Sequence, residues 1–354
     1  MADSGAKKLR RMLERLRPLP DDLKSYGIED FFAAVDGART EEERYSVHQR
    51  FSGEQPPRFS VCDSDLNTQR YLNRYLIAVN GETDMNGLFI CSFHSAESRR
   101  KEIFANHTYF AGRLVYFFDF LWHRACPKLF FMKKIYFKIY HKVKRVYPVV
   151  EVMGRLSYCG FLIRCIREIN GVTYVVTQKN GEPQTENRPS YGLFVSIPRV
   201  GKHGKIIYVR KIRTMYAYSE FLQGFTFELN ELSDGGKIAD DFRISGWGRI
   251  LRKYFIDEIP MFYNVFNGDM KLVGVRPLTR QYFQLYTPEM QAYRTRHKPG
   301  MLPPYYVECP HTLEEVQANE KRYLDAYEAN RWRTQWSYFW KILYNVLIKR
   351  KHSS

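Results

Sequence analysis

One short segment, Ile256–Leu278, constrains this chain more than any other part of its sequence. It brings together acidic residues, an asparagine, two glycines and an Arg-Pro pair. Pro277 restricts Arg276 to an extended backbone, because the proline ring clashes with a helical conformation of the residue before it. Two further motifs accompany the segment: Lys211-Ile-Arg213-Thr-Met215 precedes it, and Lys298-Pro299-Gly300 follows it. These motifs are where we expect the chemistry of the chain.

The composition points to an anionic partner. The 354-residue chain carries a net charge of +17, and 16% of its residues are aromatic. A protein this basic is attracted to nucleic acid, to an anionic membrane surface or to phosphate-bearing substrates. The sequence contains no helix-turn-helix pattern, no zinc knuckle and no RNA-binding aromatic-glycine motif. Its lysines accompany aromatic segments, which favours a membrane surface, so nucleic acid is not expected as a partner.

The cysteines and the apolar runs indicate where the protein resides. The six cysteines form no CxxC pair and no zinc-type spacing with histidine, as expected of reduced cytosolic thiols. The charged N-terminus lacks the apolar core of a signal peptide. No apolar run approaches the roughly 20 residues that span a bilayer. We therefore expect a peripheral protein on the cytoplasmic side, with no spanning helix.

The N-terminal half is expected to form two parts. Residues 1–58 are charged and helix-prone. Residues 59–182 predict a small α/β unit with a buried strand near 87–92, a helix over 150–159 and a hairpin whose turn is Asn170-Gly171. This order of elements resembles the C-terminal half of a methyltransferase-like Rossmann domain. No glycine-rich nucleotide loop precedes it, so the resemblance implies a degenerate remnant and not a working methyltransferase.

The α/β unit contains an aromatic and basic segment, residues 109–145. Its aromatics are interleaved with lysines, and Pro127 is expected to break the helix that carries them. Two interpretations fit this pattern: an element seated in the lipid headgroup region, or a core helix with a solvated lysine face. A polar linker is expected at 179–189. Residues 190–354 then form a third domain, whose last helix is rich in aromatic residues.

Taken together and in this order, the motifs of the third domain resemble the catalytic domain of bacterial sugar transferases, the monotopic phosphoglycosyl transferases. The resemblance implies a mixed α/β fold (α+β) associated with the membrane. It also implies transfer of a phosphosugar from a nucleotide diphosphosugar to a polyprenyl phosphate, with Mg²⁺ as cofactor. The setting would be the cytoplasmic face of the bacterial inner membrane, in envelope polysaccharide or glycoconjugate biosynthesis. Further candidate partners are a second copy of the chain, as a homodimer, and glycan-assembly proteins.

The resemblance also assigns roles to basic residues. Arg213 matches an arginine that positions phosphate, a role for which the planar guanidinium is suited. Arg276 and Pro277 match the motif at the nucleotide end of the donor. Two further substrate-binding candidates are Lys211 and Lys298. Arg243 is a third, and it forms an Asp-x-Arg pair with Asp241.

The acidic residues Asp257 and Glu258 match an acidic pair of the family. Two roles are open for them. They would either bind the metal ion or form ion pairs with Arg252 and Lys253, which lie one turn earlier.

The chain departs from the family at the catalytic pair itself, where Ser219-Glu220 stands in place of Asp-Glu. A carboxylate is already ionised at neutral pH, whereas a serine hydroxyl needs a neighbouring base. Glu220 is adjacent, but consecutive side chains of a helix point about 100° apart. The change also removes a negative oxygen from a Mg²⁺ site, for which Glu220 and Asp257 remain the candidate ligands.

Three hypotheses follow from this departure. In the first, Ser219 replaces the aspartate as nucleophile, or Glu220 takes over that role. In the second, the fold transfers a group by direct displacement, with Glu220 as base and no covalent step. In the third, the domain is catalytically silent and acts as a scaffold or binding module of a glycan assembly complex.

Overall fold

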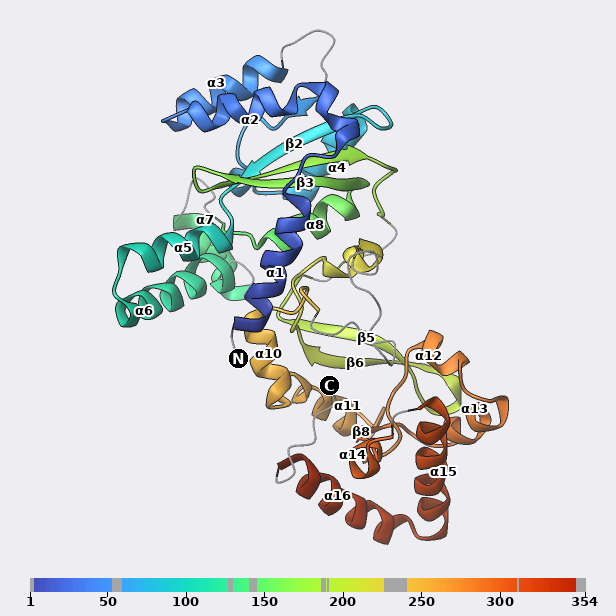
Figure 1. The fold of residues 1–354 in the computed structure, drawn as a ribbon. Helices are drawn as coiled ribbons and strands as arrows, with labels where there is room; N and C mark the ends of the chain where they lie inside the picture. Colours follow the sequence, from blue (N-terminus) through green and yellow to red (C-terminus); the bar gives the residue numbers. More distant parts are fainter. Residues whose placement is uncertain are drawn as a thin grey trace. The chain divides into compact units, whose positions relative to one another are not determined.

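The computed structural model of the chain describes residues 3–52, 59–126, 130–139, 145–185, 189, 191–225, 241–310 and 312–347. These residues fold into two compact units, both drawn in Figure 1. The N-terminal unit holds the described residues up to 192, together with those within 215–231 and 238–245. The C-terminal unit holds the described residues within 193–214 and those from 246 onward. The chain therefore passes between the two units more than once.

A four-stranded mixed sheet forms the centre of the N-terminal unit. Its strand order is β1 (Ser60–Val61), β2 (Leu88–Phe93), β4 (Val172–Lys179) and β3 (Phe161–Ile169), with β1 parallel to β2 and the other neighbours antiparallel. Asn170 and Gly171 join β3 to β4 with φ of 50° and 78°, the left-handed backbone that a two-residue hairpin turn requires. The hairpin predicted from the Asn-Gly pair is confirmed.

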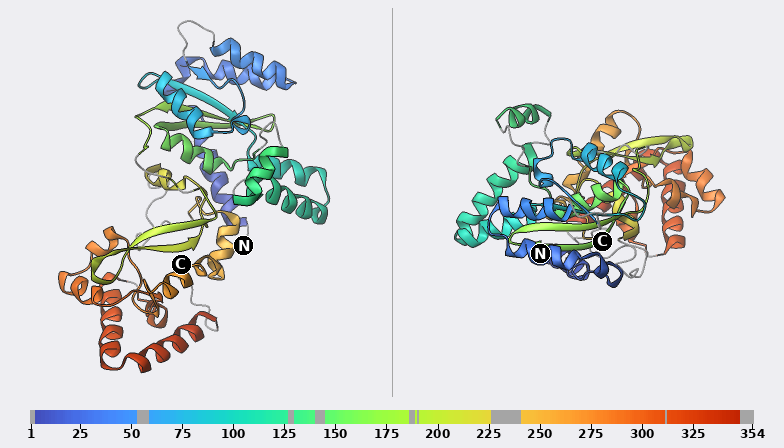
Figure 2. Two further views of the ribbon diagram at one scale, coloured as in Figure 1. Left: turned by 180° about the vertical axis from the view of Figure 1, so that it is seen from behind. Right: turned by 90° about the horizontal axis from the view of Figure 1, so that it is seen from above.

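Helices cover both faces of this sheet (Figure 1, Figure 2). Successive strand residues point to opposite faces. In β4, Tyr174 and Val176 pack with α2 (Ile28–Gly37) and α3 (Glu41–Ser52), whereas Val175 faces the other side. That other side carries α1 (Asp3–Leu16), α4 (Leu72–Glu82) and α8 (Val149–Tyr158). The unit is thus a three-layer α/β arrangement.

The first two parts expected from the sequence share one core. Phe31 and Phe32 of α2 and Phe51 of α3 are buried in the same apolar cluster as the strand residues Ile90 and Tyr174. The expected boundary at residue 58 therefore does not separate two compact parts. The composition of the first residues is dominated by charge, while their apolar side chains gather on one face of each helix and meet the sheet.

The aromatic and basic segment is helical where the structure describes it. Its elements follow α5 (Ala96–Asn106) and are α6 (Tyr109–Phe120), a π-helical turn (Leu121–Ala125) and α7 (Phe130–Ile139). Pro127, the expected helix breaker, lies outside the described residues. Tyr109, Phe110 and Phe118 are largely exposed, whereas Tyr136 is buried. Among the described residues, no helix combines the length and the apolarity needed to cross a membrane.

The C-terminal unit is built on two short sheets. β5 (Phe194–Val200) pairs antiparallel with β6 (Ile206–Ile212), and β7 (Lys271–Val273) pairs parallel with β8 (Gly300–Leu302). The helices of this unit are α10 (Gly246–Lys253), α11 (Met261–Phe266), α12 (Arg280–Gln284), α13 (Pro288–Thr295), α14 (Tyr305–Glu308), α15 (Leu313–Ala329) and α16 (Arg331–Leu347). Tyr323 and Leu324 of α15 are fully buried in its main apolar cluster. The predicted mixed α/β fold class is confirmed.

A segment of the expected third domain packs with the N-terminal unit instead. It includes the 3-10 turn η6 (Ser219–Leu222), and Leu222 is fully buried in the apolar cluster that contains α8. Ala217, Tyr218 and Phe242 belong to the same cluster. The domain predicted over 190–354 is therefore interrupted. Apolar residues in a short segment do not reveal which surface they will meet, so the sequence could not show this.

Candidate functional site

Two motifs that lie far apart in the sequence meet within the C-terminal unit. Lys211, near the end of β6, places its Nζ 2.6 Å from Oε1 of Glu258. Glu258 ends the 3-10 turn η7 (Ile256–Glu258), which follows Phe255 in a left-handed backbone conformation with φ of 55°. Both charged side chains are mostly shielded from solvent, which strengthens their attraction. Lys211 is therefore a partner of the acidic pair that the sequence did not indicate.

Asp257 is the more buried member of the acidic pair, with 8% of its surface exposed. Burial raises the pKa of its carboxyl, while the charge of Lys211 lowers it and that of Glu258 raises it further. Because burial outweighs the nearby cation, the ionised carboxylate retains charge that the protein does not fully compensate. An additional cation would stabilise this ionised form.

Tyr306 is affected by the charges of the same carboxylates and of Arg276. Burial raises the pKa of Tyr306, on α14, and the charges of Glu258 and Asp257 raise it further, whereas Arg276 lowers it. These couplings link Tyr306 to the acidic pair and to the motif arginine. Tyr306 was not a predicted site residue. Its signal in the sequence was the run Pro-Pro-Tyr-Tyr at 303–306, which differs from the small, flexible turn expected of the family.

Two glycines set the backbone that carries Arg276. A Cβ on Gly300 would lie 2.0 Å from the backbone nitrogen of Gly274, and a Cβ on Gly274 would lie 2.9 Å from that of Gly300. Only glycine permits so close an approach of two backbones. The Gly-Val-Arg-Pro loop and the Lys-Pro-Gly loop therefore cross where β7 pairs with β8. The glycines of both motifs are a packing requirement of this crossing.

A buried arginine supports the same loop. Arg294 of α13 donates a hydrogen bond from Nη2 to the carbonyl oxygen of Arg276 at 2.6 Å. The same Nη2 lies 3.6 Å from Oε1 of Glu320, on α15. Burial raises the pKa of Glu320 to about 7, although Arg294 acts to lower it. Sequence analysis missed Arg294, because nothing local distinguishes it from the other arginines of that region.

Arg199 of β5 adds a second guanidinium near Arg276. Burial, and then the charge of Arg276, lowers the pKa of Arg199. The two segments are tied together because the N–H of Val200 donates to the carbonyl oxygen of Leu278 at 2.9 Å. Two guanidinium groups that repel each other favour binding of an anion, which relieves the repulsion. The edge of the unit that carries the motif arginine is thus suited to phosphate.

Ser219 and Glu220, which were expected at the position of the family's catalytic pair, lie in the N-terminal unit. Ser219 begins η6 and is 2% exposed, whereas Glu220 beside it is exposed to solvent. Arg243 lies in the same unit, and its guanidinium is engaged by Asp241. Nε of Arg243 lies 2.9 Å from both carboxylate oxygens, and Nη2 lies 2.6 Å from Oδ2. The Asp-x-Arg pair is therefore a buried ion pair.

The predicted site residues are distributed over both units. The N-terminal unit contains Ser219, Glu220 and Arg243. The C-terminal unit contains Lys211, Arg213, Asp257, Glu258, Arg276, Pro277 and Lys298. Of these, the structure brings together Lys211, Asp257 and Glu258, while Arg276 is linked to the acidic pair only through the charges that act on Tyr306. Arg213 and Pro277 are half-buried, while Lys298 is exposed with its Nζ beside Gly268.

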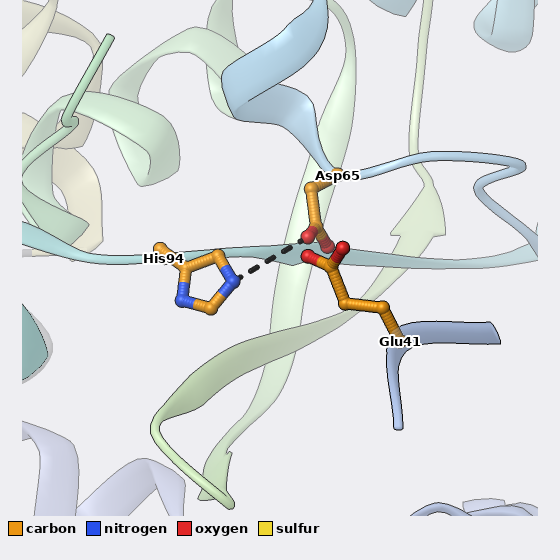
Figure 3. A group of neighbouring side chains, drawn as sticks. All are labelled: Glu41, Asp65 and His94. Carbon is orange, nitrogen blue, oxygen red and sulfur yellow. Dashed lines mark ion pairs between the residues drawn. The ribbon is translucent and has the colours of Figure 1, made fainter. Parts of the chain in front are cut away.

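Among the described residues, one cluster has the composition of a metal site: Glu41, Asp65 and His94 of the N-terminal unit (Figure 3). Asp65 is already neutralised, because Nη1 and Nη2 of Arg44 each lie 2.8 Å from one of its oxygens. Ser92 Oγ donates to the same carboxylate at 2.6 Å, and His94 approaches it at 3.7 Å. A buried ion-pair network accounts for the cluster without a metal.

The acidic pair of the C-terminal unit suits a different kind of ion. Mg²⁺ is usually bound through one or two carboxylates together with substrate phosphates and water. Asp257 has the incompletely compensated carboxylate that such an ion needs, whereas Glu258 is paired with Lys211. Glu220, the other expected ligand, belongs to the N-terminal unit. Of the two expected Mg²⁺ ligands, Asp257 is therefore the one that lies in the C-terminal unit.

A hollow of about 290 Å³ is lined by residues of β6 and α11. Asn264 of α11 lines this hollow, and its side chain both accepts and donates a hydrogen bond with the backbone of β6. Its Oδ1 accepts from the N–H of Arg210 at 3.0 Å, and its Nδ2 donates to the carbonyl oxygen of Tyr208 at 2.8 Å. Because its amide offers both a donor and an acceptor, the asparagine of the long motif holds α11 against the edge of β6.

Comparison with known proteins shows which family and which proteins the region of these motifs resembles. Residues 186–349 match the family model described as bacterial sugar transferase. The chain is 38% identical over 154 residues to the uncharacterized sugar transferase EpsL of Bacillus subtilis, covering 43% of this chain and 65% of that protein. It is 33% identical over 144 residues to the undecaprenyl-phosphate galactose phosphotransferase of Salmonella typhimurium, covering 39% and 29%.

A third relative is the UDP-N-acetylgalactosamine-undecaprenyl-phosphate N-acetylgalactosaminephosphotransferase of Aeromonas hydrophila. It is 37% identical over 107 residues, which cover 29% of this chain and 22% of that protein. The chain thus spans at most 65% of the length of these three relatives. The matched residues contain the motif loops and the acidic pair described above.

Proposed function

Because residues 186–349 of this chain belong to the bacterial sugar transferase family, we propose that the protein transfers a phosphosugar from a nucleotide diphosphosugar to a polyprenyl phosphate. The names of two relatives, from Salmonella and Aeromonas, specify undecaprenyl phosphate as acceptor. We place the reaction at the cytoplasmic face of the bacterial inner membrane, in the biosynthesis of an envelope polysaccharide or glycoconjugate.

The observation that carries this proposal is the charged cluster of the C-terminal unit. It contains the Lys211–Glu258 ion pair and the buried Asp257, and Tyr306 is affected by both carboxylates and by the motif residue Arg276. Phosphoryl transfer depends mostly on cations that surround the phosphates and on groups that hold them in place. Arg276 and Lys211 supply such cations, and Arg213 adds a third by its match to the family motif. Mg²⁺, held by Asp257, would neutralise charge that develops on the phosphate oxygens.

Two routes to the products use Glu220. In the covalent route, a carboxylate oxygen of Glu220 attacks the β-phosphorus and the nucleoside monophosphate leaves. An oxygen of the polyprenyl phosphate then attacks the same phosphorus, and the Glu220 carboxylate is released. In the direct route, the acceptor oxygen displaces the nucleoside monophosphate in one step, with Glu220 as base. Ser219 is the weaker candidate, because it is 2% exposed and Glu220 faces solvent.

Release of nucleoside monophosphate tests the proposal. Purified protein would be incubated with a panel of UDP-sugars, Mg²⁺ and undecaprenyl phosphate. We expect release by the natural protein and by Ser219→Ala, and its loss in Glu220→Gln. Glu289→Gln is the matched control, since Glu289 is an exposed glutamate of α13.

A catalytically silent scaffold is the second candidate, and one observation favours it. Ser219, which is expected at the position of the family's aspartate, is buried and offers no carboxylate. If no sugar supports release, and only Ser219→Asp restores it, the natural protein has lost the reaction and the scaffold role stands.

We also propose that a membrane surface is a partner of the C-terminal unit. Trp332, Trp336 and Trp340 of α16 are exposed and four residues apart, so they form one stripe along the helix. Arg333 and Lys341 lie on the same helix, and tryptophans with basic residues suit the lipid headgroup region. Flotation with liposomes that contain anionic lipid tests this; failure of the protein to float with them would contradict it.

For the N-terminal unit we propose a degenerate methyltransferase-like remnant without methyl transfer. The parallel pair β1–β2 and the terminal hairpin β3–β4 support the resemblance noted in the sequence. Titration calorimetry with S-adenosylmethionine is the appropriate measurement, and saturable binding would overturn this interpretation.

A further inference from the structure

Helix α6 of the N-terminal unit is attached to its neighbour α5 along one face (Figure 1). This inner face carries Gly112, Tyr116 and Asp119, whose spacing along the sequence places them on one side of the helix. A Cβ on Gly112 would lie 3.2 Å from the ring of Phe104, on α5, and the rings of Phe104 and Tyr116 lie 6.1 Å apart. Arg99 of α5 donates from Nε to Oδ1 of Asp119 at 2.7 Å. The inner face is therefore fully used in packing and ion pairing with α5.

The outer face of α6 is apolar and open to solvent. Phe110, Leu114 and Phe118 follow one another at intervals of one helical turn, so they form a stripe, and Phe110 and Phe118 are 75% and 63% exposed. Phe117 and Leu121, beside this stripe, are exposed as well. A surface helix ordinarily turns polar residues outward, and α6 contains no lysine. The interpretation of this helix as a core helix with a solvated lysine face is therefore wrong.

Helix α7 adds two further exposed apolar residues. Ile135 and Ile139 are exposed and one turn apart, and Lys138 between them is exposed too. Tyr136 is buried instead, with its ring 6.2 Å from that of Trp122 in the π-helical turn that ends α6. This contact attaches α7 to the end of α6, so the exposed residues of both helices belong to one helical segment.

The charge of this segment is positive. Between residues 103 and 150 the sequence contains lysines and arginines throughout, and Asp119 is its single acidic residue. The carboxylate of Asp119 is mostly shielded from solvent and is paired with Arg99. Arg113 is exposed on α6, with its guanidinium carbon 4.3 Å from the centre of the Tyr109 ring. The apolar face is thus accompanied by cations, and the one carboxylate of the segment is already neutralised.

The apolar face and the positive charge together select the partner. Large exposed apolar surfaces mark sites that bind a protein or a membrane. A second copy of the chain would bring the same cations to a symmetric contact, where like charges repel. An anionic lipid bilayer attracts the cations and accepts the apolar side chains between its headgroups, as it does for other interfacial helices. The anionic bilayer is the partner that satisfies both properties.

We propose that the outer face of α6, with the exposed isoleucines of α7, docks the N-terminal unit on an anionic lipid bilayer. The stripe of Phe110, Leu114 and Phe118 enters the boundary between headgroups and acyl chains, and Arg113 lies at the level of the lipid phosphates. The segment lies outside residues 186–349, which match the family model. The inference is therefore independent of the proposed reaction, and it concerns a different surface from the tryptophan stripe of α16.

Vesicle binding by the full-length protein tests the docking surface. Phe110→Ser combined with Phe118→Ser removes apolar surface at two exposed positions and leaves the contacts with α5 intact. Tyr71→Ser combined with Met85→Ser is the matched control, since both residues are 59% exposed elsewhere in the same unit. Arg113→Gln removes one cation. Co-sedimentation is measured with vesicles of phosphatidylcholine, with and without phosphatidylglycerol.

We expect the natural protein and the control to bind the vesicles that contain phosphatidylglycerol. The partition coefficient of the double phenylalanine variant should be about tenfold lower or less, because two apolar side chains no longer leave water. Arg113→Gln should lower it by about threefold to fivefold, and only for the anionic vesicles. The same ratios are expected when Trp332→Ser and Trp336→Ser are also present, so the outcome for α16 does not decide the outcome for α6.

Amide hydrogen exchange gives a local measurement that needs no substitution. Anionic vesicles should slow exchange over residues 109–121 of the natural protein, because a helix seated in the headgroup region opens less often. Exchange that the vesicles leave unchanged over these residues would overturn the proposal.

Three binding results would also contradict it. One is equal binding of the natural protein and the double phenylalanine variant, and another is equal binding of the natural protein to vesicles with and without phosphatidylglycerol. The third is a double phenylalanine variant that loses self-association in analytical ultracentrifugation but keeps its vesicle binding, which would assign the face to a second copy of the chain. None of these measurements requires turnover, so they decide the docking surface even if the protein releases no nucleoside monophosphate.

Discussion

At the scale of single residues, the C-terminal unit buries oppositely charged side chains in pairs, and these pairs support the motif loops. Arg294 holds the carbonyl of Arg276, and Glu320 lies beside Arg294. Burying such a pair costs desolvation that its mutual attraction does not always repay. The raised pKa of Glu320 shows that desolvation prevails here. Support for the loop therefore comes at the expense of stability.

The pH dependence of stability follows from Glu320. Its pKa of about 7 in the folded protein lies above its ordinary value of 4.5, so the folded state binds the proton more tightly than the unfolded state. This contribution to stability is complete below about pH 4.5 and is lost as the pH rises through 7. Arg294, Tyr286 and Arg276 are the charged or titratable groups that act on it.

Glu320→Gln, whose amide resembles the protonated carboxyl, should remove this dependence of stability on pH. Relative to the natural protein, we expect the variant to gain about 1 to 3 kcal/mol of stability between pH 5 and pH 8. Urea unfolding followed by the fluorescence of the α16 tryptophans measures it. Glu289→Gln, at an exposed glutamate, is the control. Equal pH slopes in the natural protein and in Glu320→Gln would show that the carboxyl is not protonated near neutral pH.

At the scale of elements, the crossing of two loops determines where Arg276 lies. β7 and β8 are only three residues long each, so their hydrogen bonds alone do not define the loops that follow. The contact between Gly274 and Gly300 does, because it admits no side chain. Motif glycines of this kind matter because they let two backbones approach closely, and not because they react.

Gly300→Ala tests the crossing. The new Cβ would lie 2.0 Å from the nitrogen of Gly274, so the loops must separate, and we expect a loss of about 1 to 3 kcal/mol in stability. Displacement of Arg276 should also weaken nucleotide binding by about tenfold, measured by titration calorimetry with UDP. Gly246→Ala is the control, since a Cβ there meets nothing within 4 Å. The same behaviour in both variants would refute the importance of the crossing.

At the scale of the whole molecule, the family domain and the compact units do not coincide. The matched region covers 186–349, yet Leu222 and Tyr218 within it belong to the apolar cluster of the N-terminal unit. The matched region therefore contributes residues to both units.

Leu222→Ala should consequently destabilise the N-terminal unit, although the residue lies in the sugar transferase region. We expect a loss of about 2 to 5 kcal/mol, as for other fully buried leucines, seen as faster hydrogen exchange in β2 and β4. Leu324→Ala, at a leucine that is fully buried in α15, should instead speed exchange in the C-terminal unit. If Leu222→Ala affects only the C-terminal unit, the assignment of this segment is wrong.

Much of the local structure could be predicted from the sequence, because it depends on residues close together in the chain. The Asn170-Gly171 turn required only its two residues, and Gly160 ends the region of α8 with φ of 85°, as a glycine stop does. The motifs also identified the acidic pair and Arg276 as candidate site residues. These inferences use periodicity, turn chemistry and motif spacing, all of which are local properties.

Only the tertiary structure decided which of these residues meet. The partner of Glu258 is Lys211, the support of Arg276 is Arg294, and Tyr218 contacts Asn73 of α4 and Gly154 of α8. Each contact joins segments that are distant in sequence, and no local preference encodes the choice of partner. The sequence by itself determined the elements and the family, whereas packing determined the geometry of the site, because only folding brings distant side chains to one place.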